Sequence, residues 1–454
     1  MKRIILLSVV VMFQGALLAG DSPRPNLVAH EWGTFTSFQG GDGALLSWKP
    51  LETSKLPGFV YDWTKPGLGR QRFMLTKDGI TSLQRMETPV VYFYSDKEQK
   101  VDLEVKFPQG QITEWYPQAR EVGPSIIPPS PALAETDALL RRVGAPPSVS
   151  LVSLLGNKPV AQSLIHWTGI DVLPPTRRAK ATELLPMDRS GSHYFAARET
   201  DSACLGLDSL SRTNAPVEYE KFLFYRGIGS FATPLTVTMK ANDSLTVTNT
   251  GKETLRHLFV LKVKNQTGHF IHLDELPAGQ EKMVPITEAD LPLPKLADKL
   301  CGEMAEALVA RGLYPREAKA MVNTWKDSWF AEEGVRVLYV LPREWTDRTL
   351  PMEIKPAPKE LVRVMVGRAE VLTPETEGQL TRLITRADDG DTQAMKQLKT
   401  RLEGLGRFAE PALFRAMDAA KAPQESRAGL MALLTTPQPK RTENGIAAKE
   451  VGAR

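Results

Sequence analysis

The chain has few of the residues that ordinarily mark a catalytic or metal site. It contains two cysteines and six histidines in 454 residues, with no CxxC motif or Cys/His cluster of the kind that holds zinc. It also lacks a P-loop, an HExxH motif, a dinucleotide-binding fingerprint and a G-x-S-x-G nucleophile elbow. No run of Lys and Arg with interleaved aromatic residues occurs, which argues against nucleic-acid binding. We therefore expect no cofactor, no metal and no nucleic-acid partner.

The composition is that of an ordinary globular protein, with 42% hydrophobic and 24% charged residues. The length suits two or three domains with well-buried cores. The two cysteines, Cys204 and Cys301, could form a disulfide in an oxidising compartment. Cys301, however, falls beside Leu300 and Met304 on an expected amphipathic helix, which favours a buried free thiol.

Residues 1–20 have the pattern of a secretory signal peptide. Lys2 and Arg3 precede an apolar run, Ile4–Ala19, that is short for a membrane span and is interrupted at Gln14. Cleavage would leave 55 basic against 53 acidic residues, a net charge of +2. We expect an exported protein, periplasmic or extracellular, without stable membrane insertion after cleavage. Asp21 stands where a lipoprotein would need Cys, which argues against a lipid anchor.

The hydrophobic periodicity predicts a mainly β fold with α: two β-rich, sandwich-like units, an inserted helical hairpin and a small C-terminal helical appendage. The signal peptide is expected at 1–20, and the N-terminal β-rich domain at 27–233 with a Pro-rich excursion at 123–148. The sandwich-like domain is expected at 234–372 and contains the helical hairpin at 296–330. The appendage follows at 373–435, and a disordered tail at 436–454. Within the first unit, Lys100–Phe107 and Ile112–Tyr116 read as a β-hairpin, and His193–Arg198 reads as a strand.

Several motifs together resemble a known family. HEWGTFTSFQGGDG, METPVVYFYSD, ITEWYPQA, VLYVLPREWTD and LVRVMVGRAE, spread from His30 to Glu370, are similar to a family of secreted bacterial proteins with no assigned activity. The resemblance implies a single architecture over most of the mature chain, and it transfers no catalytic residues.

The stretch Leu27–Asp42, LVAHEWGTFTSFQGGD, is the first candidate for a site. Alternation along a strand places His30 and Trp32 on one face and Glu31 on the other. These side chains could line a site, or they could be a core histidine, a packed ring and a solvated carboxylate. The absence of metal spacing or of a triad favours the second interpretation.

The stretch Leu341–Arg348, LPREWTDR, is the second candidate. It follows a strongly apolar strand and presents Arg343, Trp345 and Asp347 close together, as a ligand-binding loop on a rigid scaffold does. Trp345 could instead be a plug that covers the edge of a sandwich. Both interpretations stay open at this point.

The first functional hypothesis is an exported, β-rich binding or assembly protein of the cell envelope, whose partner is an envelope polysaccharide or a protein. The alternative is an exported hydrolase that cleaves polysaccharide or peptide through paired carboxylates. Its catalytic candidates are Glu31, Glu87 and His30, with Glu199 and Asp347 as further acids.

A third and weaker hypothesis is a metal-dependent enzyme that uses His30 with His193, or the pair His269 and His272. Residues three apart on a strand point to opposite faces, so the last two could not share one ion without a bulge.

Overall fold

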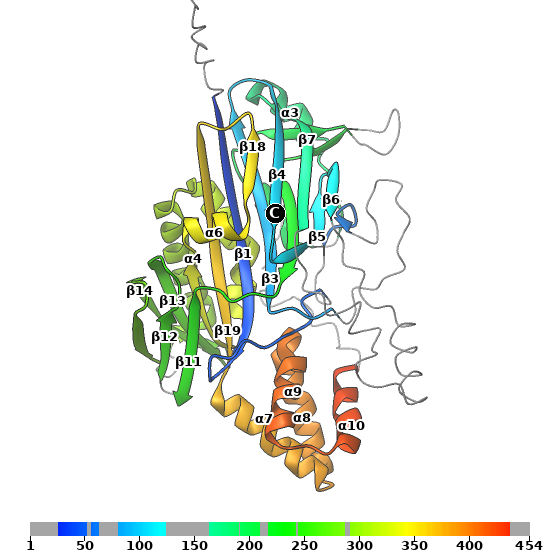
Figure 1. Cartoon of the computed structure of the whole chain (residues 1–454), viewed down its shortest axis with the longest axis vertical. Helices are drawn as coiled ribbons and strands as arrows, with labels where there is room; N and C mark the ends of the chain where they lie inside the picture. The colour runs from blue at the N-terminus through cyan, green and yellow to red at the C-terminus, as the bar shows by residue number, and fades with distance from the viewer. Residues whose placement is uncertain are drawn as a thin grey trace, which may run out of the picture.

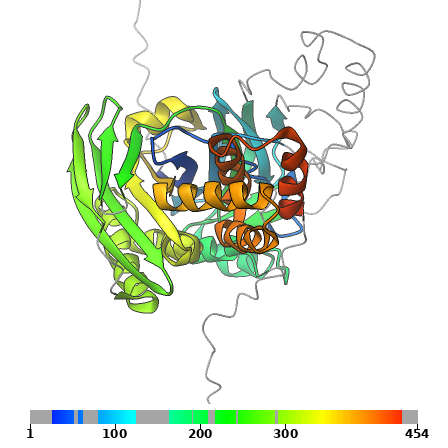
Figure 2. The same cartoon turned by 90° about the horizontal axis from the view of Figure 1, so that it is seen from below.

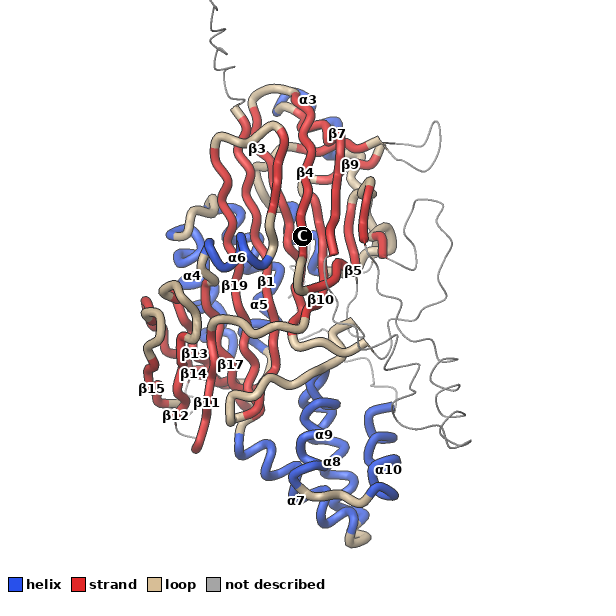
Figure 3. Tube along the Cα trace, in the orientation of Figure 1, coloured by secondary structure: helices blue, strands red, loops and turns tan. Residues whose placement is uncertain are grey.

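The computed structural model describes residues 26–51, 56–62, 80–123, 163–189, 191–208, 217–241, 244–286 and 291–435. The expected signal peptide, the tail that was expected to be disordered, a predicted strand at 149–155 and nearly all of the Pro-rich excursion lie outside these residues. Within them the fold is mainly β with α, as predicted (Figures 1 and 3). No helix in these ranges is long and apolar enough to cross a membrane.

A ten-stranded central sheet runs through the molecule. Its strands, in spatial order, are β16 (Leu291–Pro292), β14 (Thr267–Leu276), β13 (Leu255–Lys264), β17 (Gly334–Val340), β19 (Glu360–Leu372), β1 (Leu27–Gly40), β3 (Gln84–Ser95), β10 (Leu223–Gly229), β5 (Gly110–Tyr116) and β2 (Tyr61–Asp62). Neighbours pair antiparallel except β1 and β19, which are parallel from Val28↔Glu360 to Gly40↔Leu372. The first and last long strands therefore lie side by side in the middle of the sheet (Figure 1).

Two smaller sheets complete the β structure. The larger contains β18 (Met352–Lys355), β4 (Gln99–Phe107), β7 (Ser163–Leu173), β8 (Cys204–Leu207) and β9 (Glu218–Glu220), with β6 (Glu121–Gly123) pairing β7. The smaller contains β11 (Leu235–Ala241), β12 (Ser244–Asn249) and β15 (Glu281–Pro285). Both contribute to one apolar core with the central sheet. The two predicted β-rich units thus share a sheet, and β18 and β19 from the second pair with β4 and β1 of the first.

The opposite face of the central sheet is covered by the helical hairpin. It consists of α4 (Leu293–Ala310), α5 (Pro315–Lys326) and a π-helical turn η2 (Asp327–Ala331). Leu300, Met304 and Trp329 have no exposed surface and belong to a second core with the sheet. Gly312 links the two helices with a φ of +106°, a backbone conformation that residues with a Cβ rarely adopt.

The C-terminal helical appendage forms a third core. Its helices are α7 (Pro374–Asp388), α8 (Thr392–Leu405), α9 (Ala409–Ala419) and α10 (Gln424–Thr435), with a short 3₁₀ turn η3 (Gly406–Phe408) before α9. The side chain of Asp391 caps α8 by accepting bonds from the N–H groups of Gln393 and Ala394. Phe38 of β1 and Leu372 of β19 pack into this core, so the appendage sits at one end of the central sheet (Figure 1) and lies in front of it when the molecule is seen from below (Figure 2).

Two local predictions were wrong. β4 and β5 do not pair as a hairpin; they belong to different sheets, and the turn at Pro108 carries the chain from one sheet to the other. His193–Arg198 is a 3₁₀ helix (η1), not a strand, and Ser192 caps it by accepting a hydrogen bond from the N–H of Tyr194. Besides η1, the described ranges contain two short helices outside the hairpin and the appendage, α3 (Pro175–Thr182) and α6 (Arg343–Thr349).

Candidate functional site

His30 lies on β1 beneath the helical hairpin. Its Nδ1 is 2.7 Å from Oε2 of Glu317 on α5, and neither side chain has exposed surface. Glu317 also accepts hydrogen bonds from the Tyr94 hydroxyl at 2.6 Å and from the backbone N–H of Tyr314 at 2.8 Å. The ring of Tyr314 covers His30, with 4.4 Å between the centroids. His30 therefore attaches the start of α5 to the central sheet.

Glu31 points to the opposite face of β1, as alternation predicted. Its Oε2 accepts a hydrogen bond from Nε of Arg363 at 2.6 Å, and its Oε1 accepts one from the Tyr225 hydroxyl. Arg363 also donates to Asp347 Oδ1 at 2.9 Å and to the Leu350 carbonyl at 2.8 Å. Burial opposes the charge on Arg363, but Glu31, Tyr225 and Asp347 together outweigh burial and raise the guanidinium pKa. The structure thus brings Glu31 and Asp347 together as partners of one arginine.

Glu87 is on the other side of the sheet from Glu31. It lies opposite Thr34 in the β1–β3 register and accepts a hydrogen bond from Arg407 at 2.9 Å. Burial raises the pKa of Glu87, but Arg407 and Arg85 lower it more strongly, to about 2. Glu31 and Glu87 therefore do not form the predicted pair across a cleft, and Glu87 has the reverse of the raised pKa that a general acid needs.

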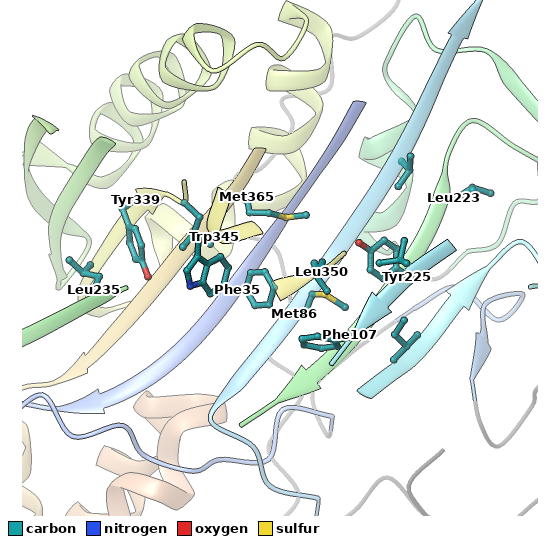
Figure 4. Close-up of a cluster of buried hydrophobic side chains, with 14 of the residues drawn as sticks. Phe35, Met86, Phe107, Leu223, Tyr225, Leu235, Tyr339, Trp345, Leu350 and Met365 are labelled. Atoms are coloured by element: carbon teal, nitrogen blue, oxygen red, sulfur yellow. The ribbon is translucent and has the colours of Figure 1, made fainter. Parts of the chain in front are cut away.

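The two tryptophans offered as ligand contacts are core residues. Trp345 is on α6, not on a loop, and is 9% exposed. Its ring meets the ring of Phe35 edge-on, with 5.3 Å between the centroids (Figure 4). This packing agrees with the interpretation of Trp345 as a plug. Trp32 has no exposed surface and packs 6.1 Å from Tyr92. Because Trp32 is fully buried and Trp345 is almost fully buried, both rings serve the core, and their assignment to ligand binding is corrected.

Arg343 and Asp347 remain partly exposed on α6. They pair with each other at 2.7 Å, Nε to Oδ2, four residues apart on one helix turn. Arg343 also donates to the Leu361 carbonyl at 2.6 Å. Because most of their polar atoms are already bonded within the protein, they form the outer part of the Glu31–Arg363 network.

The histidines of the metal hypothesis do not converge. Among the described residues, no group of three or more His, Cys, Asp or Glu side chains has the geometry to hold a metal ion. His272 stacks on Phe259 at 4.1 Å and lies 3.4 Å from Glu303. His193 is on the surface of η1, while His30 is fully buried. Cys204 and Cys301 are free thiols.

A feature that the sequence reasoning missed is a belt of buried charges across the central sheet. We name this feature the charge belt. It consists of Arg85, Glu87, Glu114, Arg226, Arg336, Arg368 and Glu370 on the strands, together with Glu332 and Arg407 from the segments that cover them. In the register, Arg368 and Arg85 flank Thr36 on opposite sides, and Arg336 lies opposite Glu370. The available signal was an arginine inside an apolar strand, as in MVGRAEVL.

One half of the charge belt is fully paired. Glu370 accepts from Arg336 at 2.9 Å and from Arg368 at 2.7 Å. Arg368 also bonds Glu332 at 2.7 Å and Ser328 at 2.6 Å. Burial raises the pKa of Glu332, but Arg368, Arg407 and Arg336 together outweigh burial and hold that pKa at about 2. These contacts attach η2 to the sheet.

A groove on the surface of the appendage is lined by polar and cationic side chains. It has a volume of about 620 Å³ and lies between α7 and α8. Its lining residues are Gln379, Arg382, Leu383, Arg386, Gln393, Lys396, Gln397, Thr400 and Arg401. They recur at helical spacing on both helices, so two helix faces meet there. Four of the lining residues are cationic and none is acidic.

Comparisons with known proteins identify no relative. No protein-family model matches the chain, and no curated protein matches it. Among solved structures, the yeast delta-COP-I mu-homology domain aligns with 77% of this chain and 100% of its own, at 9% identity and a TM-score of 0.25. The same domain in complex with a Dsl1 WxWxV peptide aligns with 76% of this chain and 96% of its own, at 8% identity and a TM-score of 0.24. Similarity at this level supports no conclusion about fold or function.

Proposed function

We propose that this chain is an exported binding protein of the bacterial cell envelope and that the groove between α7 and α8 holds an acidic polysaccharide. Export is supported by the signal-peptide pattern of residues 1–20 and by the resemblance to secreted proteins. The observation that carries the ligand class is the lining of the groove, which combines four cations with three glutamines and a threonine and contains no acid.

The charges of the groove are only partly neutralised by the protein. Arg386 is paired with Asp391 at 2.6 Å, and Arg401 donates to the side chain of Gln379. Arg382 and Lys396 are exposed and have no ion-pair partner among the described residues. Guanidinium and ammonium groups suit carboxylate or sulfate substituents, whereas amides and hydroxyls suit sugar hydroxyls. An acidic sugar polymer matches both kinds of lining group.

The hydrolase alternative has less support. Its proposed carboxylates, Glu31 and Glu87, lie on opposite faces of β1 and β3 and are both bonded to arginines. The two candidate acids that do come together, Glu31 and Asp347, both accept hydrogen bonds from Arg363, which favours their charged forms and not the protonated form of a general acid. Binding therefore accounts for the geometry better than glycoside or peptide hydrolysis does.

A binding measurement with a matched charge control tests the ligand class. We expect the mature protein to bind polygalacturonate, with an affinity that falls as salt is added, and not to bind neutral dextran. Arg382→Glu with Lys396→Glu should weaken binding by about tenfold or more. Lys282→Glu with Lys319→Glu changes the net charge equally at exposed sites away from the groove and should have little effect.

Equal losses of affinity in the two double variants would show that binding depends on net charge and not on the groove.

Export is tested separately by the intact mass of the protein recovered from the envelope fraction. A mass that retains Met1–Ala19 would contradict cleavage of the signal peptide.

A further inference from the structure

A small cavity lies where β17 leaves the central sheet. It has a volume of about 120 Å³, which is room for several water molecules or one small organic group. Its lining residues are Arg311, Val340, Leu341, Arg343, Leu361, Val362, Arg363 and Val364. Three of these residues are arginines, none is acidic and the others are apolar. The cavity therefore combines positive charge with an apolar wall.

The cavity borders a stretch of β19 that has no neighbouring strand on one side. β17 pairs with β19 only as far as Val340↔Val366, and one further bond joins the Leu341 N–H to the Met365 carbonyl at 2.8 Å. Along a strand, the backbone groups of alternate residues point to the same side. Arg363, two residues before Met365, therefore directs its N–H and C=O towards the cavity. In the described part of the chain, no strand pairs with these two groups.

The other two arginines approach this open edge from opposite faces of the sheet. Arg311 follows α4, which packs in the core beneath the hairpin, whereas Arg343 begins α6, whose Trp345 packs in the core of the other face. Arg343 reaches the edge itself, since its Nη1 donates to the Leu361 carbonyl at 2.6 Å. Arg311 is exposed, and its side chain has no hydrogen bond or ion pair with another described residue.

Arg363 adds a buried cation to the lining. Its side chain is 1% exposed. Its Nε donates to Glu31 and its Nη1 to Asp347, but its Nη2 is enclosed and has no partner among the described residues. An enclosed donor of this kind costs stability until an acceptor reaches it. Asp347 also pairs with Arg343, so Arg311 is the arginine of the lining that no described acid contacts.

We propose that this cavity binds the C-terminal carboxylate of a peptide whose last residue adds to the open edge of β19. Arg311 and Arg343 donate to the carboxylate, which suits the planar fork of a guanidinium. The N–H of Arg363 also donates to the carboxylate, and the N–H of the last peptide residue donates to the Arg363 carbonyl. Addition to an exposed strand edge and capture of a terminal carboxylate are both established ways to recognise a peptide.

The peptide terminus suits this edge better than a free inorganic anion does. An inorganic anion would leave the Arg363 carbonyl without a donor, whereas a terminal carboxylate beside an amide N–H matches both backbone groups. The valines and leucines of the wall favour a small apolar side chain on the last residue. The site is separate from the α7–α8 groove and does not depend on the function proposed for it.

Fluorescence anisotropy with defined peptides tests the proposal. The probe is fluorescein-Gly-Gly-Val-Ala with a free carboxyl terminus, titrated with the mature protein in a chloride buffer of constant ionic strength. We expect saturable binding that weakens about tenfold or more when a carboxamide replaces the terminal acid, because the charge-assisted bonds are lost. Methylation of the last peptide nitrogen should weaken binding about fivefold, because it removes the N–H that faces the Arg363 carbonyl.

A variant locates the binding at the cavity. Arg311→Gln removes an exposed side chain that bonds no other described residue, so the chain should fold normally. It should weaken binding of the free acid about tenfold and bring the affinities of acid and carboxamide close together. Arg177→Gln removes an exposed arginine of α3 that is paired with Glu98, and it should leave both affinities unchanged.

Three results would overturn the proposal. They are no saturable binding of the free acid, equal affinities of the acid and the carboxamide, and an unchanged affinity in Arg311→Gln. Competition separates the peptide from a bare anion. Unlabelled peptide should displace the probe at a far lower concentration than sodium acetate does. If acetate displaces it equally well, the cavity holds an adventitious ion only.

Discussion

Replacing Glu31 by Gln distinguishes a structural acid from a catalytic one. The substitution keeps the shape of the side chain but removes the charge that faces Arg363, whose side chain is 1% exposed. Breaking a buried ion pair ordinarily destabilises a protein by ~3–5 kcal/mol, because the remaining charge is left uncompensated. Asp347 still bonds Arg363 at 2.9 Å, so we expect a loss near the lower end, about 3 kcal/mol. Urea unfolding followed by tryptophan fluorescence measures the change.

Two further variants make the measurement specific. Glu31→Leu combined with Arg363→Met removes both charges and should recover at least half of the lost stability, because a pair of apolar side chains leaves nothing uncompensated. Glu353→Gln breaks an exposed pair with Lys355 and should leave the unfolding midpoint unchanged. If Glu31→Gln unfolds at the same urea concentration as the unsubstituted chain, the buried pair does not hold β1 as the structure indicates.

Three other outcomes follow from the structure. Trp325→Ala should cost about 3–5 kcal/mol, because its ring is 7% exposed in the core beneath the hairpin, and near-normal thermal stability would contradict that packing. The folded pKa of Glu87, about 2, lies below its ordinary 4.5, so its contribution is present above pH 4.5 and is lost as the pH falls towards 2. Glu87→Gln should therefore flatten the stability profile in that window by about 3 kcal/mol at most, and an unchanged acid limb of the denaturation curve would refute the assignment. Burial raises the pKa of Cys204 to about 11 and also raises the pKa of Cys301. Neither thiol should therefore react readily with iodoacetamide at pH 7.5 until the chain is unfolded. Rapid labelling of the native protein would show that these thiols are accessible.

The helices were the most predictable part of the fold. The appendage follows from start and stop signals in the chain, such as Pro374 after Thr373 and the Asp391 cap, because these act through the nearest backbone N–H groups. The hairpin follows from apolar residues at helical spacing around Leu300 and Met321. His193–Arg198 was misassigned since a six-residue stretch contains too little periodicity to separate a 3₁₀ turn from a strand.

The sequence predicted which face of the strand each candidate side chain occupies, but not which residues it bonds. Alternation correctly separated His30 and Trp32 from Glu31, because the side-chain period of a strand is a local property. It could not show that Arg363 and Glu317, both about 300 positions away along the chain, would supply the bonds. A carboxylate that is buried and paired has the same sequence neighbours as one that lines a cleft.

The sequence by itself therefore determined the local elements and the inward face of each. It determined them because propensity, capping and periodicity depend on residues within a few positions of one another. Only the tertiary structure decided which strands pair. The parallel contact of β1 with β19 joins the two ends of the β structure, and it depends on the packing of the whole sheet. That pairing also placed Arg368, Thr36 and Arg85 in one row, so the charge belt exists only in the folded chain.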